Sequence, residues 1–231
     1  MLGKSKRPRK NYWEENIQGF AGFYDKKSEE NISGACGMAY IYKKLIFPIE
    51  KKFMRNRYNI VSAYIEKNVH QGMKVADIGC GSGIFTKKMA NKNAKVYAID
   101  YTESALNLTK KNLSMDELTS VELINLDIIS EHIPPVDLTI SIGVLTYIDE
   151  IDQYLDNILP YTYLFLFNFL DSNHPLNVIR KMAPILDVRN YSYYSTNDIK
   201  NKLEARNFKI NLIQKLATGF MVHSEKKTVS V

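Results

Sequence analysis

The sequence predicts an α/β domain with a mostly parallel sheet and helices on both of its faces. Short runs rich in β-branched and aromatic residues have the length of strands: residues 73–79, 95–100, 121–127, 137–143 and 163–171. Helix-forming stretches separate several of these runs, at residues 85–91, 103–113 and 151–159. Strands that alternate with helices are typical of a parallel sheet, because each helix carries the chain back to the same edge.

A different pattern ends the chain. A helix predicted over residues 197–206 is followed by two extended runs, at residues 209–217 and 220–225. Thr218 and Gly219 lie between these runs and form a turn, so the two strands must be antiparallel. We therefore expect a seven-stranded sheet that is mostly parallel and has an antiparallel last strand.

The first part of the chain predicts an N-terminal helical extension. Residues 11–68 are predicted to be mostly helical, and Pro48 favours the start of a new helix because it disfavours a helical residue before it. We therefore divide the chain into two parts. Residues 1–60 form a basic tail and the helical extension. Residues 61–231 form the main domain, in which residues 172–195 are a lid insertion.

Composition narrows the class of protein. The chain has 231 residues, which suits one domain, and two cysteines, which favour a reducing, cytoplasmic location over a disulfide framework. No apolar run approaches the ~20 residues needed to cross a bilayer, and no apolar segment of a secretory signal follows the basic start. No cluster of His, Cys, Asp and Glu has the spacing of metal ligands, so we expect no metal.

The net charge of +6 is concentrated at the N-terminus. The first ten residues hold five Lys or Arg and no acid, so the other 221 residues carry a net charge of only +1. A basic tail can contact nucleic acid or anionic lipid. Terminal segments of this kind are more often solubilising ends, so we do not expect a nucleic-acid substrate.

The clearest functional signal is a glycine-rich loop within residues 75–83, whose sequence is VADIGCGSG. The loop follows an apolar strand directly and leads into a helix. Glycines at such a place allow a tight turn and let a ligand approach the backbone without interference from Cβ atoms. The loop alone does not establish a ligand site, because similar glycines also serve turns that bind nothing.

Two carboxylates strengthen the prediction of a ligand site. Asp100 ends the next strand, 23 residues after Asp77, where a carboxylate can bind a ribose diol. Asp127 ends the third strand, where it can accept a hydrogen bond from an adenine amino group. All three acids lie at the carboxyl ends of strands, which is the edge at which open α/β sheets bind ligands.

Over roughly residues 61–225 the chain resembles the class I S-adenosylmethionine-dependent methyltransferases. That family places an acid and an apolar residue before Gly-x-Gly-x-Gly. The matching positions here are Asp77, Gly79, Gly81 and Gly83. The resemblance implies a Rossmann-like methyltransferase fold with S-adenosyl-L-methionine as the cofactor. It also implies these cofactor-binding residues: Tyr24, Asp77, Gly79, Cys80, Gly81, Gly83, Asp100, Tyr101, Asp127, Ile128 and Ile142.

A nicotinamide or flavin site is the main alternative for the loop. That motif requires a glycine three positions after Gly81, where this chain has Ile84. Asp77 would also place a carboxylate beside a pyrophosphate, which is unfavourable, whereas the same carboxylate suits a cationic methionine moiety. No Gly-Lys-Ser or Gly-Lys-Thr follows, so the loop is not a P-loop.

The catalytic residues are expected outside the cofactor motifs. Transfer from a sulfonium needs mainly alignment of the acceptor, although an oxygen or nitrogen acceptor can also need a base. We predict His174, which follows the fifth strand, because histidine is a common general base, and Tyr147, which follows the fourth strand. Asp149 and Asp171 are further candidates, and a loop histidine without a catalytic role is the alternative for His174.

The insertion at residues 172–195 is the predicted source of substrate specificity. It holds Arg180, Lys181 and Arg189 against a single acid, Asp187, together with three tyrosines. Basic and aromatic side chains suit an anionic or ring-bearing acceptor. The alternative is an amphipathic helix that only covers the sheet.

We therefore expect methyl transfer to an oxygen or nitrogen of a small metabolite. The Asn-Pro-Pro-Tyr motif of adenine and glutamine N-methyltransferases would follow the fourth strand, where residues 142–147 have the sequence IGVLTY. A methyltransferase that acts on protein or RNA, and a non-catalytic cofactor-binding protein, remain alternatives. The helix-rich start and the Thr218-Gly219-Phe220 end are also similar to the magnesium-protoporphyrin O-methyltransferases. The identity of the acceptor and the oligomeric state stay open.

Overall fold

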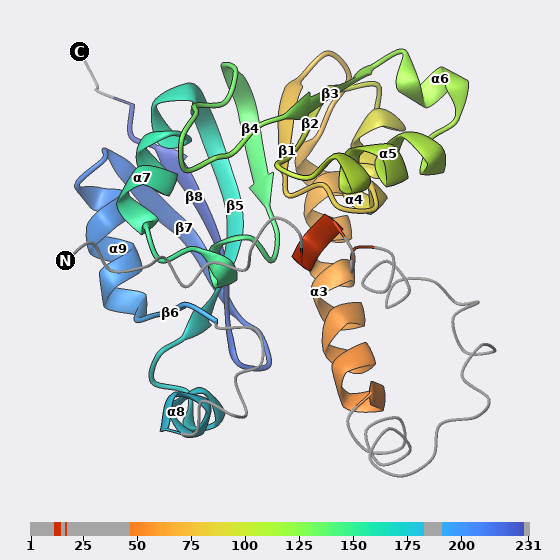
Figure 1. Ribbon diagram of the computed structural model, residues 1–231. Coiled ribbons are helices and arrows are strands. Elements are labelled where there is room, and N and C mark those ends of the chain that lie inside the picture. Colours follow the sequence, from red (N-terminus) through yellow and green to blue (C-terminus); the bar gives the residue numbers. More distant parts are fainter. Residues whose placement is uncertain (1–11, 15–16, 18–46, 183–190, 229–231) are drawn as a thin grey trace, which may run out of the picture.

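The computed structural model describes residues 12–14, 17, 47–182 and 191–228 (Figure 1). Within these residues an eight-stranded sheet forms the centre of the fold. Its strands are β1 (Lys74–Ile78), β2 (Lys95–Asp100), β3 (Val121–Asn125), β4 (Val136–Ser141), β5 (Thr162–Asp171), β6 (Tyr193–Tyr194), β7 (Phe208–Lys215) and β8 (Gly219–Lys226). The α-helices are α3 (Phe47–Asn68), α4 (Ile84–Ala90), α5 (Glu103–Asn112), α6 (Met115–Leu118), α7 (Ile151–Asp156), α8 (Pro175–Met182) and α9 (Thr196–Glu204).

The sheet has the order β3-β2-β1-β4-β5-β8-β7, and β6 pairs with β5. The pairs among the first five strands are parallel, whereas β8 is antiparallel to both of its neighbours. The mostly parallel sheet with an antiparallel last strand is therefore confirmed, and the two-residue β6 is an addition to the seven predicted strands. The chain order reverses between β1 and β4, so the carboxyl ends of these two strands mark the ligand-binding edge.

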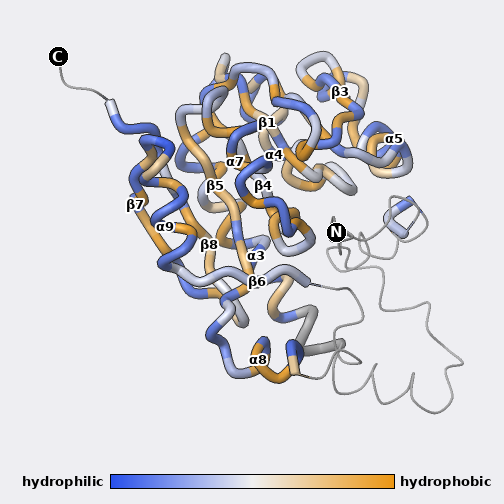
Figure 2. The backbone as a smooth tube through the Cα atoms, turned by 60° about the vertical axis from the view of Figure 1, so that its left-hand side comes forward, coloured by the Kyte–Doolittle hydropathy of each residue, from blue (hydrophilic) through white to orange (hydrophobic). Residues whose placement is uncertain are grey.

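Helices cover both faces of the sheet, as the alternation along β2 illustrates. Val96 lies in a core with Met89 of α4 and residues of α3, whereas Tyr97 lies in a second core with Tyr154 of α7 and residues of α9. Successive side chains of a strand point to opposite faces, so the central strands must be apolar on both sides. Figure 2 shows this apolar character along β5. The prediction of helices on both faces is confirmed.

Helix α3 joins the N-terminal part of the chain to the main domain. Its side chains Val61 and Ile65 are fully buried against Met89 of α4. Pro48 is the second residue of α3, where its missing N–H costs no helical hydrogen bond. The helix runs across the predicted division between residues 60 and 61, and that division stays a prediction.

The insertion at residues 172–195 contains α8 and β6 and ends at a helix cap. The Ser195 hydroxyl accepts a hydrogen bond from the Asp198 N–H at 3.1 Å, and the Asp198 carboxylate accepts one from the Ser195 N–H at 3.3 Å. This reciprocal cap fixes the start of α9. Residues 183–190, which include Asp187 and Arg189, lie outside the described residues. The role of the insertion as a lid stays a prediction.

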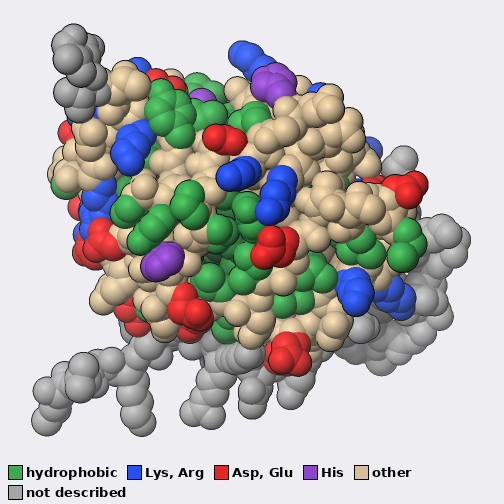
Figure 3. Space-filling model, turned by 90° about the horizontal axis from the view of Figure 1, so that it is seen from above, with side chains coloured by type: hydrophobic (Ala, Val, Ile, Leu, Met, Phe, Trp, Pro, Cys, Tyr) green, Lys and Arg blue, Asp and Glu red, His purple; other side chains and the backbone are tan. Residues whose placement is uncertain are grey.

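Two findings concern the kinds of partner that the fold can accept. In the part of the chain that is described, no helix combines the length and apolar composition that crossing a membrane requires, and no group of three or more His, Cys, Asp and Glu is placed to hold a metal ion. On the face seen in Figure 3, acidic and basic side chains are interspersed around apolar ones. That face therefore lacks the single-sign character of a polyanion-binding surface.

Candidate active site

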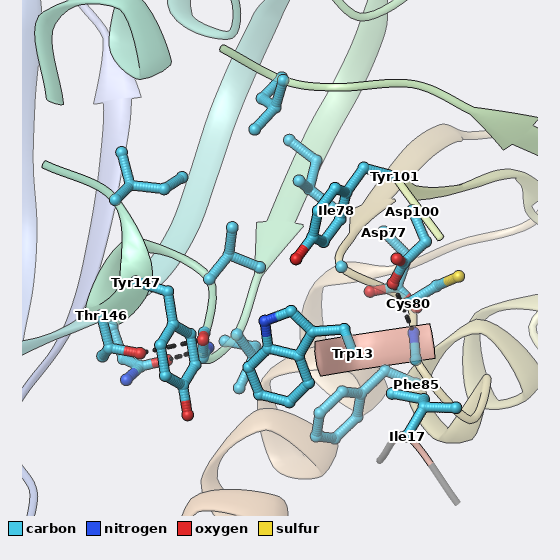
Figure 4. A pocket seen from close by; sticks show the side chains of 18 of the residues that line it. Trp13, Ile17, Asp77, Ile78, Cys80, Phe85, Asp100, Tyr101, Thr146 and Tyr147 are labelled. Atoms are coloured by element: carbon cyan, nitrogen blue, oxygen red, sulfur yellow. Dashed lines mark hydrogen bonds between the residues drawn. The ribbon is translucent and has the colours of Figure 1, made fainter. Parts of the chain in front are cut away.

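A cavity of about 500 Å³ opens at the carboxyl ends of β1, β2 and β4 (Figure 4). Its volume lies in the range of small-molecule sites. Nine of the predicted cofactor-binding residues line it: Asp77, Gly79, Cys80, Gly81, Asp100, Tyr101, Asp127, Ile128 and Ile142. Of the other two, Gly83 lies just outside the wall, and Tyr24 lies outside the described residues. The sheet therefore gathers residues that are up to 65 positions apart in the sequence onto one wall, from Asp77 to Ile142.

The glycine-rich loop turns sharply between β1 and α4. Gly79 and Gly83 have positive φ values of 70° and 74°, a region that L side chains rarely adopt. A Cβ atom at Gly79 would lie 2.3 Å from Cγ2 of Val144, and one at Gly83 would lie 2.8 Å from Cγ2 of Thr109. These two glycines are therefore required by the packing of the loop against its neighbours. Gly83 contributes to the site by starting α4 rather than by lining the cavity.

Asp77 lies at the end of β1 and is almost completely buried, with 2% of its surface exposed. Its Oδ2 atom accepts a hydrogen bond of 2.6 Å from the hydroxyl of Thr86 in α4. Burial raises the pKa of Asp77 to about 6, and the hydrogen bond from Thr86 opposes this rise. The side chain therefore places a buried, readily protonated carboxylate on the cavity wall.

Asp100 lies at the end of β2 and connects the glycine-rich loop to the start of α5. Its Oδ2 atom accepts a hydrogen bond from the Gly81 N–H at 3.2 Å. Its Oδ1 atom accepts two from Thr102, at 3.0 Å from the N–H and 2.8 Å from the hydroxyl. Burial raises the pKa of Asp100, while these hydrogen bonds favour the ionised form. Because Oδ1 already accepts two hydrogen bonds, Oδ2 is the oxygen with capacity for a ligand hydroxyl.

Two further predicted residues have local roles beside the cavity. The Asp127 carboxylate accepts a hydrogen bond from the Ile129 N–H at 3.1 Å, which fixes the loop after β3. The Cys80 thiol contacts the Thr109 hydroxyl at 3.5 Å, and burial raises the pKa of Cys80 well above its usual value. Cys80 is therefore a packing residue of the loop rather than a thiolate nucleophile.

Aromatic side chains from three separate segments meet at the other end of the cavity. The Tyr147 ring centroid lies 4.9 Å from that of Trp13 and 5.4 Å from that of Tyr191. In Figure 4 Trp13 lies between Tyr147 and the group formed by Asp77 and Asp100. The N-terminal segment and the insertion therefore both contribute to the wall at this end.

The two predicted catalytic residues occupy different places. Tyr147 lines the cavity. His174 is absent from the wall that the described residues form, and its Nδ1 atom accepts a hydrogen bond from the Leu176 N–H at 3.3 Å, at the start of α8. Asp149 and Asp171 also lie outside the wall of the described residues. Asp149 accepts a hydrogen bond of 2.5 Å from the Ser192 hydroxyl, and Asp171 accepts one of 3.0 Å from the Asn173 N–H.

Among the wall residues that the sequence analysis did not predict, three carry polar or large aromatic side chains that bear on function: Trp13, Arg57 and Asn168. The buried Asn168 accepts a hydrogen bond of 2.7 Å from the Gly143 N–H and so holds the loop after β4. As the one amide in the apolar strand β5, Asn168 could have been found from the sequence. Arg57 and Trp13 gave no comparable signal, because a basic or aromatic residue is ordinary in an amphipathic helical region.

Comparison with known proteins relates the central part of the chain to methyltransferases. Residues 69–163 match the model of a family described as "Methyltransferase domain". The mitochondrial ubiquinone biosynthesis O-methyltransferase of Schizosaccharomyces pombe is 28% identical over 103 residues, which cover 43% of this chain and 38% of that protein. The ribosomal protein L11 methyltransferase of Thermoanaerobacter pseudethanolicus is 25% identical over 126 residues, which cover 54% of this chain and 41% of that protein. The chain thus spans less than half the length of these curated relatives.

The fold is also that of a solved methyltransferase. The crystal structure of magnesium protoporphyrin IX methyltransferase from Synechocystis PCC 6803 with bound SAH superposes with a TM-score of 0.72 at 16% identity. The superposition covers 94% of this chain and 98% of that chain. The likeness therefore extends to the whole architecture, and the predicted Rossmann-like methyltransferase fold is confirmed.

Proposed function

We propose that this chain is a class I S-adenosylmethionine-dependent methyltransferase that transfers a methyl group to an oxygen or nitrogen of a small metabolite. The match of residues 69–163 to a methyltransferase-domain family and the shared fold support this proposal. The observation that supports this proposal most directly is the common cavity wall of Asp77, Asp100 and Asp127. These acids come from three adjacent strands and lie at the carboxyl edge of the sheet, on the β1 side of its switch point, where open α/β sheets bind ligands.

The residues at this end of the cavity fit the cofactor chemically. Three carboxylates complement the cationic methionine part, the ribose hydroxyls and the adenine amino group, all of which are positive or donate hydrogen bonds. Asp77 is the proposed partner of the methionine part, Asp100 binds a ribose hydroxyl through Oδ2, and Asp127 accepts from the adenine amino group. Ile128 and Ile142 supply apolar surface, and Gly79 and Gly81 allow the backbone to approach the ligand.

The protein has to align the acceptor and to control one proton. When bound, S-adenosylmethionine supplies a methyl group on a sulfonium, so that the acceptor atom forms a bond to carbon while the carbon–sulfur electron pair stays on sulfur. The acceptor then has to lose a proton. Tyr147 is the proposed residue that holds the acceptor or its proton, because it lines the cavity beyond Trp13.

His174 is proposed as a positioning residue. Its Nδ1 atom accepts a hydrogen bond from the Leu176 N–H and so fixes the start of α8. Two residues of α8, Leu176 and Arg180, line the cavity. This role accounts for a histidine that stands three residues after β5 and yet is absent from the described wall.

Calorimetry tests the proposal. The purified chain should bind S-adenosylmethionine and S-adenosylhomocysteine and should show no heat with NAD. Methyl-labelled S-adenosylmethionine should then transfer its label to small molecules of a metabolite extract rather than to the protein or RNA fraction. Binding of NAD without binding of S-adenosylmethionine would overturn the proposal, and label that appears only in protein or RNA would overturn its small-molecule part.

A further inference from the structure

Charged side chains on the cavity wall are separated by sign. The three acids lie at the carboxyl ends of β1, β2 and β3, whereas the two cations of the described wall, Arg57 and Arg180, come from α3 and α8. All three acids belong to the proposed cofactor end. Of the two cations, Arg180 lies beside Tyr191, and Arg57 lies beside Gly143, four residues before Tyr147. The acids of the described wall come from other segments. Such an arrangement favours an anion and disfavours a cation at the end near Tyr147 and Tyr191.

Arg57 is held against the backbone of the loop after β4. A Cβ atom at Gly143 would lie 3.3 Å from Nη1 of Arg57, so the guanidinium packs directly on the residue that has no side chain. Gly143 has a φ of 83°, and its N–H donates to Asn168. The fold thus fixes the loop from both sides, and Thr146 and Tyr147 follow on the same loop.

Arg180 is held by two contacts that leave its guanidinium on the wall. Its Nη1 atom donates a hydrogen bond of 3.2 Å to Asn177, and its Cζ atom lies 6.0 Å from the centroid of the Tyr191 ring. Tyr191 in turn lies against Tyr147, and Tyr147 against Trp13. A row of three rings therefore runs from Arg180 toward the cofactor end.

We propose that this end of the cavity binds an aromatic acid, with Arg57 and Arg180 holding its carboxylate or phosphate and the row of rings contacting its aromatic part. The inference rests on the proposed function and names the class of its acceptor. Arginine binds such groups through several N–H donors in one plane. Hydrogen bonds from guanidinium groups occupy the lone pairs of the acid and lower its nucleophilicity. The acid is therefore the recognition group, and the methyl group goes to another oxygen or nitrogen of the molecule.

The test uses the single tryptophan of the chain, Trp13, as the reporter. Because its ring lines the cavity, its fluorescence responds to occupancy. The protein, saturated with S-adenosylhomocysteine, is titrated with 4-hydroxybenzoate, with phenyl phosphate and with the neutral 4-hydroxybenzamide. We expect at least one of the two acids to bind about 10-fold tighter than the amide. The acid with the higher affinity shows whether the site prefers a carboxylate or a phosphate. Equal binding of acids and amide, or no binding of either acid, overturns the proposal.

Matched variants assign the preference to the two arginines. Arg57→Gln and Arg180→Gln should each reduce the preference for the acid to less than about 3-fold. Lys181→Gln removes the same charge from the next position of α8, where Lys181 lies over Tyr193 and outside the wall, and should leave the preference unchanged. A preference that survives in either arginine variant removes that arginine from the proposal, and survival in both overturns it.

The proposed function and this inference can fail separately. Affinity for S-adenosylhomocysteine, measured by calorimetry, tests the cofactor end alone. Thermal melting of each variant confirms that it is folded. If the native chain binds S-adenosylhomocysteine and shows no preference for the acids, only the inference fails. If S-adenosylhomocysteine does not bind, the proposed function fails with it.

Discussion

The hydroxyl of Thr86 donates a 2.6 Å hydrogen bond to the carboxylate of Asp77, and both side chains are buried where α4 packs on β1. Burial raises the pKa of Asp77 to about 6, Thr86 lowers it, and the negative charge of Asp100 raises it. Asp77 therefore changes its charge just below neutral pH. Its ionised form is the one that would attract the cationic methionine part of the proposed cofactor.

Binding of S-adenosylmethionine should weaken as the pH falls through about 6, because protonation of Asp77 removes this attraction. Calorimetry between pH 5 and 8, in two buffers that differ in ionisation enthalpy, measures both the affinity and the protons released on binding. Asp77→Asn should bind the cofactor more weakly at pH 7.5 and lose most of this dependence. An affinity of the native chain that is constant from pH 5 to 7 would contradict the assignment.

The same carboxylate predicts how stability changes with pH. The pKa of Asp77 is higher in the folded chain than its ordinary value of 3.8, so its contribution to stability is present below about pH 4 and is lost as the pH rises through about 6. The melting temperature of Asp77→Asn, relative to that of the native chain, should therefore rise by roughly 2–4 °C or more between pH 4 and 8. Calorimetric melting of both proteins in the absence of ligand measures this difference. A difference in melting temperature that stays constant from pH 4 to 8 would show that burial does not raise the pKa of Asp77.

Asp100→Asn should lower the affinity for S-adenosylhomocysteine by about 10-fold or more, because it replaces a charge-assisted hydrogen bond to a ribose hydroxyl by a neutral one. Asn retains an oxygen that can accept from Thr102, so the fold should persist. Asp137→Asn is the matched control. Its carboxylate also accepts a backbone N–H, that of Lys74 at 2.8 Å, but it lies at the amino end of β4, away from the cavity. Equal affinities of both variants would exclude Asp100 as the ribose ligand.

The sequence predicted the sheet, and it placed the proposed cofactor residues at one edge of that sheet, for a common physical reason. A strand buried on both faces must be apolar throughout, so β1, β2, β4 and β5 stand out from the helices between them. Residues that must adopt a positive φ, such as Gly79 and Gly83, are also visible directly in the sequence. Parallel strands then bring Asp77 and Asp100 to one edge without any knowledge of side-chain contacts.

The acceptor end could not be predicted in the same way, because it is made by packing between segments far apart in the sequence. Trp13 meets Tyr147 across more than 130 residues, and Arg57 meets Gly143 across more than 80. No local pattern specifies such contacts. His174 illustrates the same limit. Its place after β5 predicts a role at the reaction centre, which stays a prediction, whereas its hydrogen bond with the backbone of Leu176 is visible only in the structure.

Removal of residues 1–10 should leave methylation of the best small acceptor within about 2-fold of that of the full chain. These residues carry five positive charges and no motif, and the deletion ends before Trp13 and Glu14. Glu14 is of interest here because its carboxylate accepts hydrogen bonds from the N–H groups of Glu103 and Ser104, at the start of α5. A large loss of activity, together with a steep dependence on salt, would favour a polyanionic substrate captured by the tail.

Tyr147→Phe should lower kcat by about 100-fold and leave the affinity for S-adenosylhomocysteine unchanged. The substitution removes only the phenol oxygen and keeps the ring contacts with Trp13 and Tyr191, so a loss of kcat reports on the hydroxyl that we place at the acceptor. Single-turnover rates with the best acceptor from the extract measure the chemical step. If kcat falls less than about 3-fold, the hydroxyl has no part in the reaction and alignment alone accounts for the rate.

His174→Ala provides the contrast that separates a catalytic residue from a positioning one. Loss of the acceptor for the Leu176 N–H loosens the start of α8, which holds Arg180 on the wall, so KM for the acceptor should rise about 5-fold or more while kcat changes little. His174→Asn should restore KM in part, because its side-chain oxygen can accept the same N–H. A fall of kcat by 100-fold in both variants, with KM unchanged, would instead place the imidazole at the reacting atoms and require α8 to move inward when the acceptor binds.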